Sequence, residues 1–223
     1  MISPNIIKFL TTLKENNNRD WFNKNKKWYQ RSREEFEVYV NCLIGEIQKF
    51  DSDIRYLPAK DCIFRIYRDV RFSKDKSPYK TNFGTHIVKD GRKSGNAGYY
   101  LHIEPGSSFL GGGIYMPPAE TLRVVRKEIF ENIEEFKFII NHKEFKYHFR
   151  EISGEKLKTF PRGFPGDFPE IELLKYKSYT VIKSVPDDFI QSKKLTEEIT
   201  RVFKAMYPFN WFINMAIAEN YRA

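Results

Sequence analysis

The sequence predicts an α+β fold in which helices cover one face of an antiparallel β meander and further helices form both termini. Three observations support this class. Apolar residues recur at helical spacing in the first 50 residues and again after residue 118, whereas the stretches between them read as strands. Short turns separate those stretches, which favours strands that pair in sequence order. With 41% hydrophobic and 16% aromatic residues, the 223-residue chain is expected to fold as a single domain over residues 1–223.

Two helices are expected near the N-terminus. Ser3-Pro4 is typical of an N-cap followed by a first helical position, and the asparagines at 16–18 should end this helix. A longer amphipathic helix is predicted from about residue 25 to residue 50. Between the two, residues 20–22 (Asp-Trp-Phe) are interpreted as an aromatic elbow that anchors the core.

The middle of the chain is predicted to form strands separated by turn-rich segments. The expected strands occupy residues 62–67, 82–88, 98–104, 109–115 and, later in the chain, 178–183. Three consecutive glycines, Gly111 to Gly113, offer no side chains for packing, so something must lie close to the backbone there. We favour a bulky aromatic side chain or a bend in the sheet, and a bound ligand is the alternative.

Helical spacing returns after residue 118. Asn132, with Glu135 three residues later, suggests a second, capped helical segment. Residues 160–166 contain two prolines and two glycines and are expected to form a shaped loop. Two terminal helices are predicted, over about residues 193–207 and 209–219, with a break at Pro208.

Charge and composition narrow the classes of partner. The chain has 38 Lys and Arg against 29 Asp and Glu, a formal net charge of +9, which favours anionic partners such as nucleic acid or phosphorylated metabolites. No stretch approaches the roughly 18 apolar residues that cross a membrane. The N-terminus does not resemble a signal peptide, so we expect a cytoplasmic protein without a membrane partner. Cys42 and Cys62 lack the spacing of a zinc or redox site and are expected to be reduced.

Residues 64–80 hold the strongest candidate site. Arginine brings a rigid fork of donors that suits phosphate or carboxylate. In the functional interpretation, Asp69 or Asp75 acts as a general base and Tyr79 donates a hydrogen bond or a proton. The residues expected to hold the anion are Arg65, Arg68, Arg71 and Lys76. The alternative is a lattice of ion pairs that only fixes the shape of this segment.

A second group of candidates should lie on one face of the sheet. If side chains alternate across the strands, His102 and Glu104 share a face, and His86 can join them from a neighbouring strand. Arg65 can project toward the same face. Two imidazoles and a carboxylate could form a metal triad, but the spacing is unspecific and we predict no metal site. Arg162 is a further candidate for binding the ligand, and a merely solvated polar face is the alternative.

One motif resembles the signature of a bacterial family known as domain of unknown function 2461. It reads Arg65-x-x-Arg68-Asp69-x-Arg71-Phe72-x-x-Asp75-Lys76-x-x-Tyr79. Other similar pieces are Trp21-Phe22, Tyr99 to Gly106, Gly113 to Pro117, Leu122 with Arg126, and Pro161 to Phe164. The resemblance spans the chain and implies a widespread, mostly single-domain family without an established activity. It directs attention to the motif as a unit, but it does not decide between an ion-pair lattice and an active site.

Together these patterns predict a pocket on the sheet that binds, and could act on, a small phosphorylated or carboxylated ligand. A non-catalytic nucleic-acid-binding module and a purely structural charge lattice are the alternatives. The cofactor, the reaction and the oligomeric state do not follow from the sequence.

Overall fold

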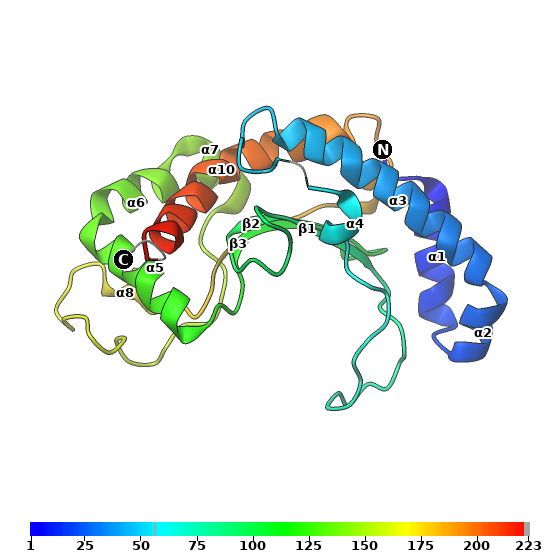
Figure 1. The fold of residues 1–223 in the computed structure, drawn as a ribbon, viewed down its shortest axis with the longest axis horizontal. Helices are drawn as coiled ribbons and strands as arrows, with labels where there is room; N and C mark the ends of the chain where they lie inside the picture. Colours follow the sequence, from blue (N-terminus) through cyan, green and yellow to red (C-terminus); the bar gives the residue numbers. More distant parts are fainter. Residues whose placement is uncertain (56, 221–223) are drawn as a thin grey trace.

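The computed structural model describes residues 1–55 and 57–220. In this part of the chain, strands form one antiparallel sheet in the order β1-β2-β3-β4, which confirms the predicted α+β class (Figure 1). The strands are β1 (Phe83–Ile87), β2 (Gly98–Ile103), β3 (Phe109–Ile114) and β4 (Tyr179–Ser184). A long helical excursion separates β3 from β4 in sequence, yet the two strands are neighbours in the sheet.

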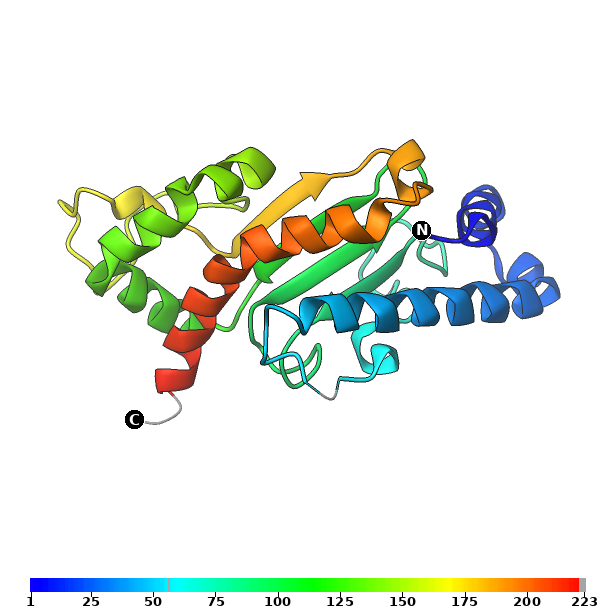
Figure 2. The same ribbon diagram turned by 90° about the horizontal axis from the view of Figure 1, so that it is seen from above.

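Helices cover one face of the sheet, as predicted. α3 (Lys26–Ile47) and α10 (Leu195–Asn220) lie across it, and Tyr99, Leu101 and Ile103 of β2 are buried on that side (Figure 2). The other helices are α1 (Pro4–Glu15), α2 (Arg19–Lys24), α4 (Ala59–Cys62), α5 (Ala119–Glu131), α6 (Ile133–Asn141), α7 (Lys143–Phe149), α8 (Ile171–Leu174) and α9 (Asp187–Ile190). None of the described helices has the length and apolar character of a membrane span.

Side-chain caps define the first two helices. The Ser3 side chain accepts a hydrogen bond from Asn5 N (3.3 Å), so this residue caps α1 as predicted. The elbow expected at 20–22 is instead part of helix α2, because Asn18 accepts a bond from Trp21 N (2.9 Å) and starts a new helical turn. Phe22 is buried and does anchor the core.

The first strand predicted from the sequence is not a regular strand. Phe64 N donates to Gly84 O (2.9 Å), and a single isolated bridge, between Ile63 and Thr85, links this stretch to β1 in the described chain. The chain then leaves the sheet and pairs with itself, and Lys80 N donates to Ile66 O (2.8 Å). We call residues 66–80 the ribbon. Most of the charged motif therefore lies on a projection rather than within the sheet.

Two predictions for the later helices are wrong. Asn132 precedes α6, but its side chain donates to Glu128 (2.7 Å) instead of capping the helix. The break expected at Pro208 does not occur, because α10 continues through it. Proline removes the N–H that would bond Lys204 O, and both residues are exposed, so water can satisfy the free carbonyl.

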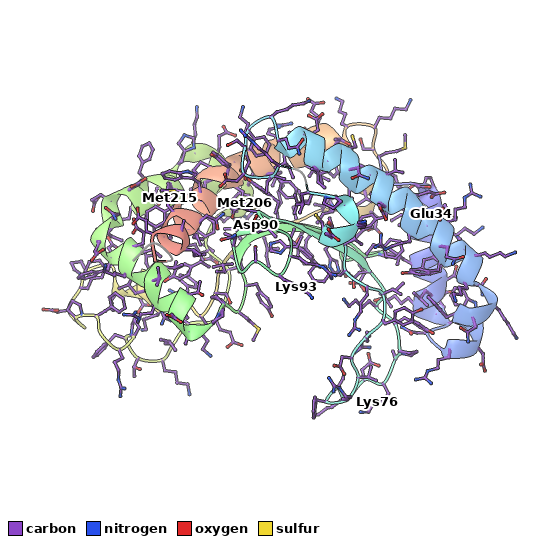
Figure 3. All side chains as sticks on the ribbon, viewed as in Figure 1. Glu34, Lys76, Asp90, Lys93, Met206 and Met215 are labelled. Carbon is purple, nitrogen blue, oxygen red and sulfur yellow. The ribbon has the colours of Figure 1, made fainter. Side chains whose placement is uncertain are left out.

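The glycine run in β3 lets α10 and the neighbouring strand β4 approach β3 closely. A Cβ on Gly112 would lie 1.9 Å from the sulfur of Met206, which is labelled in Figure 3. Gly113 has a φ of +92°, and a Cβ there would lie 2.0 Å from Tyr179 O and 3.0 Å from the Phe209 ring. Neighbouring protein atoms, among them the aromatic ring of Phe209, therefore fill the space beside Gly112 and Gly113. This agrees with the expectation that protein, and not a bound ligand, lies close to this backbone.

Candidate functional site

The face of the sheet opposite α3 and α10 carries polar and aromatic side chains. No described helix crosses this face, which we call the open face (Figure 1). Its side chains come from alternate strand positions: His86 on β1, Tyr100 and His102 on β2, and Phe109 on β3. All of them are partly exposed. The alternation predicted from the sequence therefore gives the correct face for both histidines.

Tyr100, His102 and Glu104 form a hydrogen-bonded chain along the open side of β2, which we call the relay. The Tyr100 hydroxyl lies 2.9 Å from His102 Nδ1, and His102 Nε2 lies 3.2 Å from Glu104 Oε2. Thr81 donates from its hydroxyl to the other oxygen of Glu104. One assigned tautomer satisfies every contact: Nε2–H donates to the carboxylate, and Nδ1 accepts from the tyrosine.

The surroundings set the protonation states of the relay. Burial lowers the pKa of His102, although its hydrogen bond to Glu104 opposes this effect. Burial and the negative charge of Glu104 raise the pKa of Tyr100 to about 12. The Phe109 ring stacks on His102 with centroids 4.5 Å apart and fixes the imidazole plane. Near neutral pH the imidazole is therefore a neutral base held against a protonated tyrosine.

Cations gather at one edge of the open face around Phe64. Lys80 Nζ and Arg92 Cζ lie 5.2 Å and 5.5 Å from the centre of its ring. Burial lowers the pKa of Lys80, and the positive charges of Arg65 and Arg92 lower it further. The charge of Lys80 in turn contributes to the lowered pKa of His102, so the cations adjoin the relay. Within residues 1–55 and 57–220, none of these three cations forms an ion pair with a carboxylate.

The acids and arginines of the ribbon bind one another. Arg71 forms a bidentate pair with Asp69, through Nε to Oδ1 (2.9 Å) and Nη2 to Oδ2 (2.7 Å). Arg68 pairs with Asp75, which also accepts bonds from the backbone N–H (2.9 Å) and hydroxyl (2.7 Å) of Ser77. These contacts lower the pKa of both carboxyl groups, so each is a weak base. The ion-pair lattice is the arrangement found here.

Lys76 and Tyr79 of the motif also make structural contacts. Lys76 Nζ donates to Val70 O (3.0 Å) across the ribbon. Tyr79 is buried, and its ring stacks on Phe22 with centroids 3.9 Å apart. The Asn17 side chain donates to Tyr79 O (2.9 Å) and accepts from Tyr79 N (3.1 Å). It thus satisfies both backbone groups of Tyr79, as the backbone of a paired β-strand does. Tyr79 therefore holds the base of the ribbon against the N-terminal helices.

The structure separates the predicted residues into groups. His102 and Glu104 touch each other, and Arg65 lies among the cations beside them. His86 is on the same face, where burial lowers its pKa to about 4. Arg162 is exposed in the segment 155–170, at the far end of the molecule from the ribbon (Figures 1 and 2). In the described chain, no group of three or more His, Cys, Asp or Glu is placed to hold a metal ion.

Tyr100, Thr81 and Arg92 contribute to the site and were missed from the sequence, whereas Lys80 was predicted only as part of the segment 64–80. Tyr100 has the same strand parity as His102, so the alternation that identified the histidine could also have identified the tyrosine. Thr81 and Arg92 had no such signal. Arg92 comes from the turn between β1 and β2 and reaches Phe64 only because the chain folds back.

Comparison with known proteins gives one match. The model of a family described as "Conserved hypothetical protein (DUF2461)" matches residues 5–212, which include the ribbon and the whole sheet. The resemblance found in the sequence is thereby confirmed. No curated protein and no solved structure matches the chain.

Proposed function

The chain belongs to the DUF2461 family of conserved hypothetical proteins, and from that premise we propose that its open face binds a small phosphorylated or carboxylated ligand and exchanges a proton with it. The observation that carries this proposal is the position of the relay beside Arg65, Lys80 and Arg92, which have no carboxylate partner in the described chain. Both acids of the motif, Asp69 and Asp75, pair with arginines within the ribbon.

An anion would relieve the repulsion among these cations. Lys80 is half-buried, and its lowered pKa reflects both lost hydration and the neighbouring positive charges. A phosphate or carboxylate can accept hydrogen bonds from the lysine and from the planar guanidinium forks at the same time. Such charge-assisted bonds are stronger than neutral ones and are less screened beside a partly desolvated ring such as Phe64.

The relay supplies the chemistry in this proposal. Tyr100 is the catalytic residue that touches the ligand. As it takes a proton from the ligand, its own proton passes to Nδ1 of His102, and Glu104 stabilises the imidazolium that forms. The reverse transfer makes Tyr100 a general acid. Asp69, Asp75 and Tyr79 take no part in this step, since ion pairing or core packing already occupies them.

Binding of inorganic pyrophosphate tests the proposal. We expect Lys80→Met to bind pyrophosphate about tenfold or more weakly than wild type, because a charge-assisted bond is lost while an unbranched apolar side chain remains beside Phe64. The control is Arg162→Ala, which removes an exposed arginine from the segment 155–170 at the far end of the molecule from the ribbon. Isothermal titration calorimetry measures the affinities, and circular dichroism checks the fold. Equal affinity of the wild type and Lys80→Met, or no binding to the wild type, would rule the proposal out.

A further inference from the structure

Aromatic rings form a row across the open face, starting at the cationic edge. The Phe64 and Tyr100 rings are 6.1 Å apart, and Tyr100 and Phe109 are 5.5 Å apart. Phe109 then stacks on His102. Each ring is partly exposed, so the row offers π-surface to a ligand as well as to its neighbours. Rings on a sheet face beside cations are the usual platform for unpaired nucleic-acid bases.

The ribbon carries one more ring at its tip. Phe72 is 96% exposed, and the guanidinium of Arg71 lies 5.9 Å from its centre. Figure 3 shows the ribbon, with Lys76 labelled, projecting from the sheet on the side opposite the helices. The Arg68–Asp75 pair and the hydrogen bond from Lys76 Nζ to Val70 O cross the ribbon and brace this projection. A fully exposed phenylalanine on a braced projection makes no contribution to the core, which indicates a contact with a partner.

We infer that the phosphorylated group bound at the open face belongs to a single-stranded nucleic acid, an inference that rests on the proposed anion site. Phosphates lie against Arg65, Lys80 and Arg92, one base stacks on the row of rings, and another stacks on Phe72. The chain's net charge of +9 complements a polyanion. A duplex does not fit this role, because its bases are paired and cannot reach the rings.

The length of the ribbon sets the size of the ligand. Phe72 is five residues along the ribbon from Tyr67, which pairs with Tyr79 at the base. Figure 3 shows the ribbon extended away from the sheet, and at about 3.3 Å per residue five extended residues span roughly 16 Å. A single nucleotide cannot contact both Phe72 and the cations around Phe64, whereas a short strand can. Loss of Phe72 should therefore affect an oligonucleotide and not a mononucleotide.

Fluorescence anisotropy with a labelled deoxythymidine strand of about 12 nucleotides tests this inference. We expect Phe72→Ala to bind the strand about tenfold more weakly than wild type, since a stacked base is lost. The matched control is Phe138→Ala, which removes a phenylalanine that is 73% exposed on α6. Its affinity should equal that of the wild type. Contact with about three phosphates should give a slope near −2 for log affinity against log salt concentration.

The outcomes separate this inference from the proposed function. If pyrophosphate binds through Lys80 but the strand does not bind, the anion site stands and the nucleic-acid ligand is wrong. The ligand is also wrong if Phe72→Ala and Phe138→Ala bind the strand equally, or if a hairpin duplex binds as well as the strand. If Lys80→Met binds both pyrophosphate and the strand like the wild type, both proposals fail.

Discussion

Gly113→Ala is expected to destabilise the protein by about 4 kcal/mol, which is a large part of the stability of a typical domain. Two effects combine at this position. A φ of +92° is strained for any residue with a Cβ, and the new methyl carbon would lie 2.0 Å from Tyr179 O on the neighbouring strand. Because the clashing atom belongs to the backbone of β4, relief requires the two strands to separate. Urea denaturation followed by circular dichroism measures the loss.

Gly45→Ala is the matched control for this prediction. Gly45 lies inside α3, and nothing comes within 4 Å of a Cβ placed on it. Alanine is favoured over glycine in a helix, so this variant should be about 0.5–1 kcal/mol more stable than the wild type. If both variants have the same urea midpoint of unfolding as the wild type, close packing does not explain the glycine run.

Acidification from pH 7 to about 4 is expected to remove about 2 kcal/mol of stability through His86. Burial lowers the pKa of this imidazole from 6.5 to about 4. Below pH 6.5 the unfolded chain binds a proton that the folded chain does not bind, so unfolding becomes easier until the pH reaches about 4. The two pKa values set an upper limit of about 3 kcal/mol. We expect less because part of the side chain reaches solvent.

The variant His86→Gln isolates this effect, since glutamine does not titrate. Urea denaturation of both proteins at several pH values gives the difference in their unfolding free energies. The stability of the wild type relative to the variant should fall by about 2 kcal/mol between pH 7 and pH 4. A constant difference over this range would show that His86 titrates equally in the folded and unfolded chains.

Local patterns in the sequence predict much of this fold, because they depend on neighbours a few residues apart. Strand alternation places His102 and Glu104 on one face, and the Ser3-Pro4 cap starts α1. The continuation of α10 through Pro208 was not predictable in this way. It depends on whether the freed carbonyl of Lys204 reaches water, which the surrounding tertiary structure decides.

The site was harder to predict than the fold. The alternating acids and bases of the ribbon fit either an active site or an ion-pair lattice, and only the observed pairs distinguish the two for Asp69 and Asp75. Lys80 and Arg92 meet at Phe64 through contacts between segments distant in sequence. No spacing rule predicts such contacts.

The pKa of His102, measured by NMR with and without inorganic pyrophosphate, tests the link between the anion site and the relay most directly. We expect pyrophosphate to raise this pKa, because a negative charge beside the ring stabilises the imidazolium. In Lys80→Met the rise should disappear, and the ring signals of the exposed His142 should not respond in either protein. A pKa of His102 that stays the same at saturating pyrophosphate would contradict the proposal that an anion binds next to the relay.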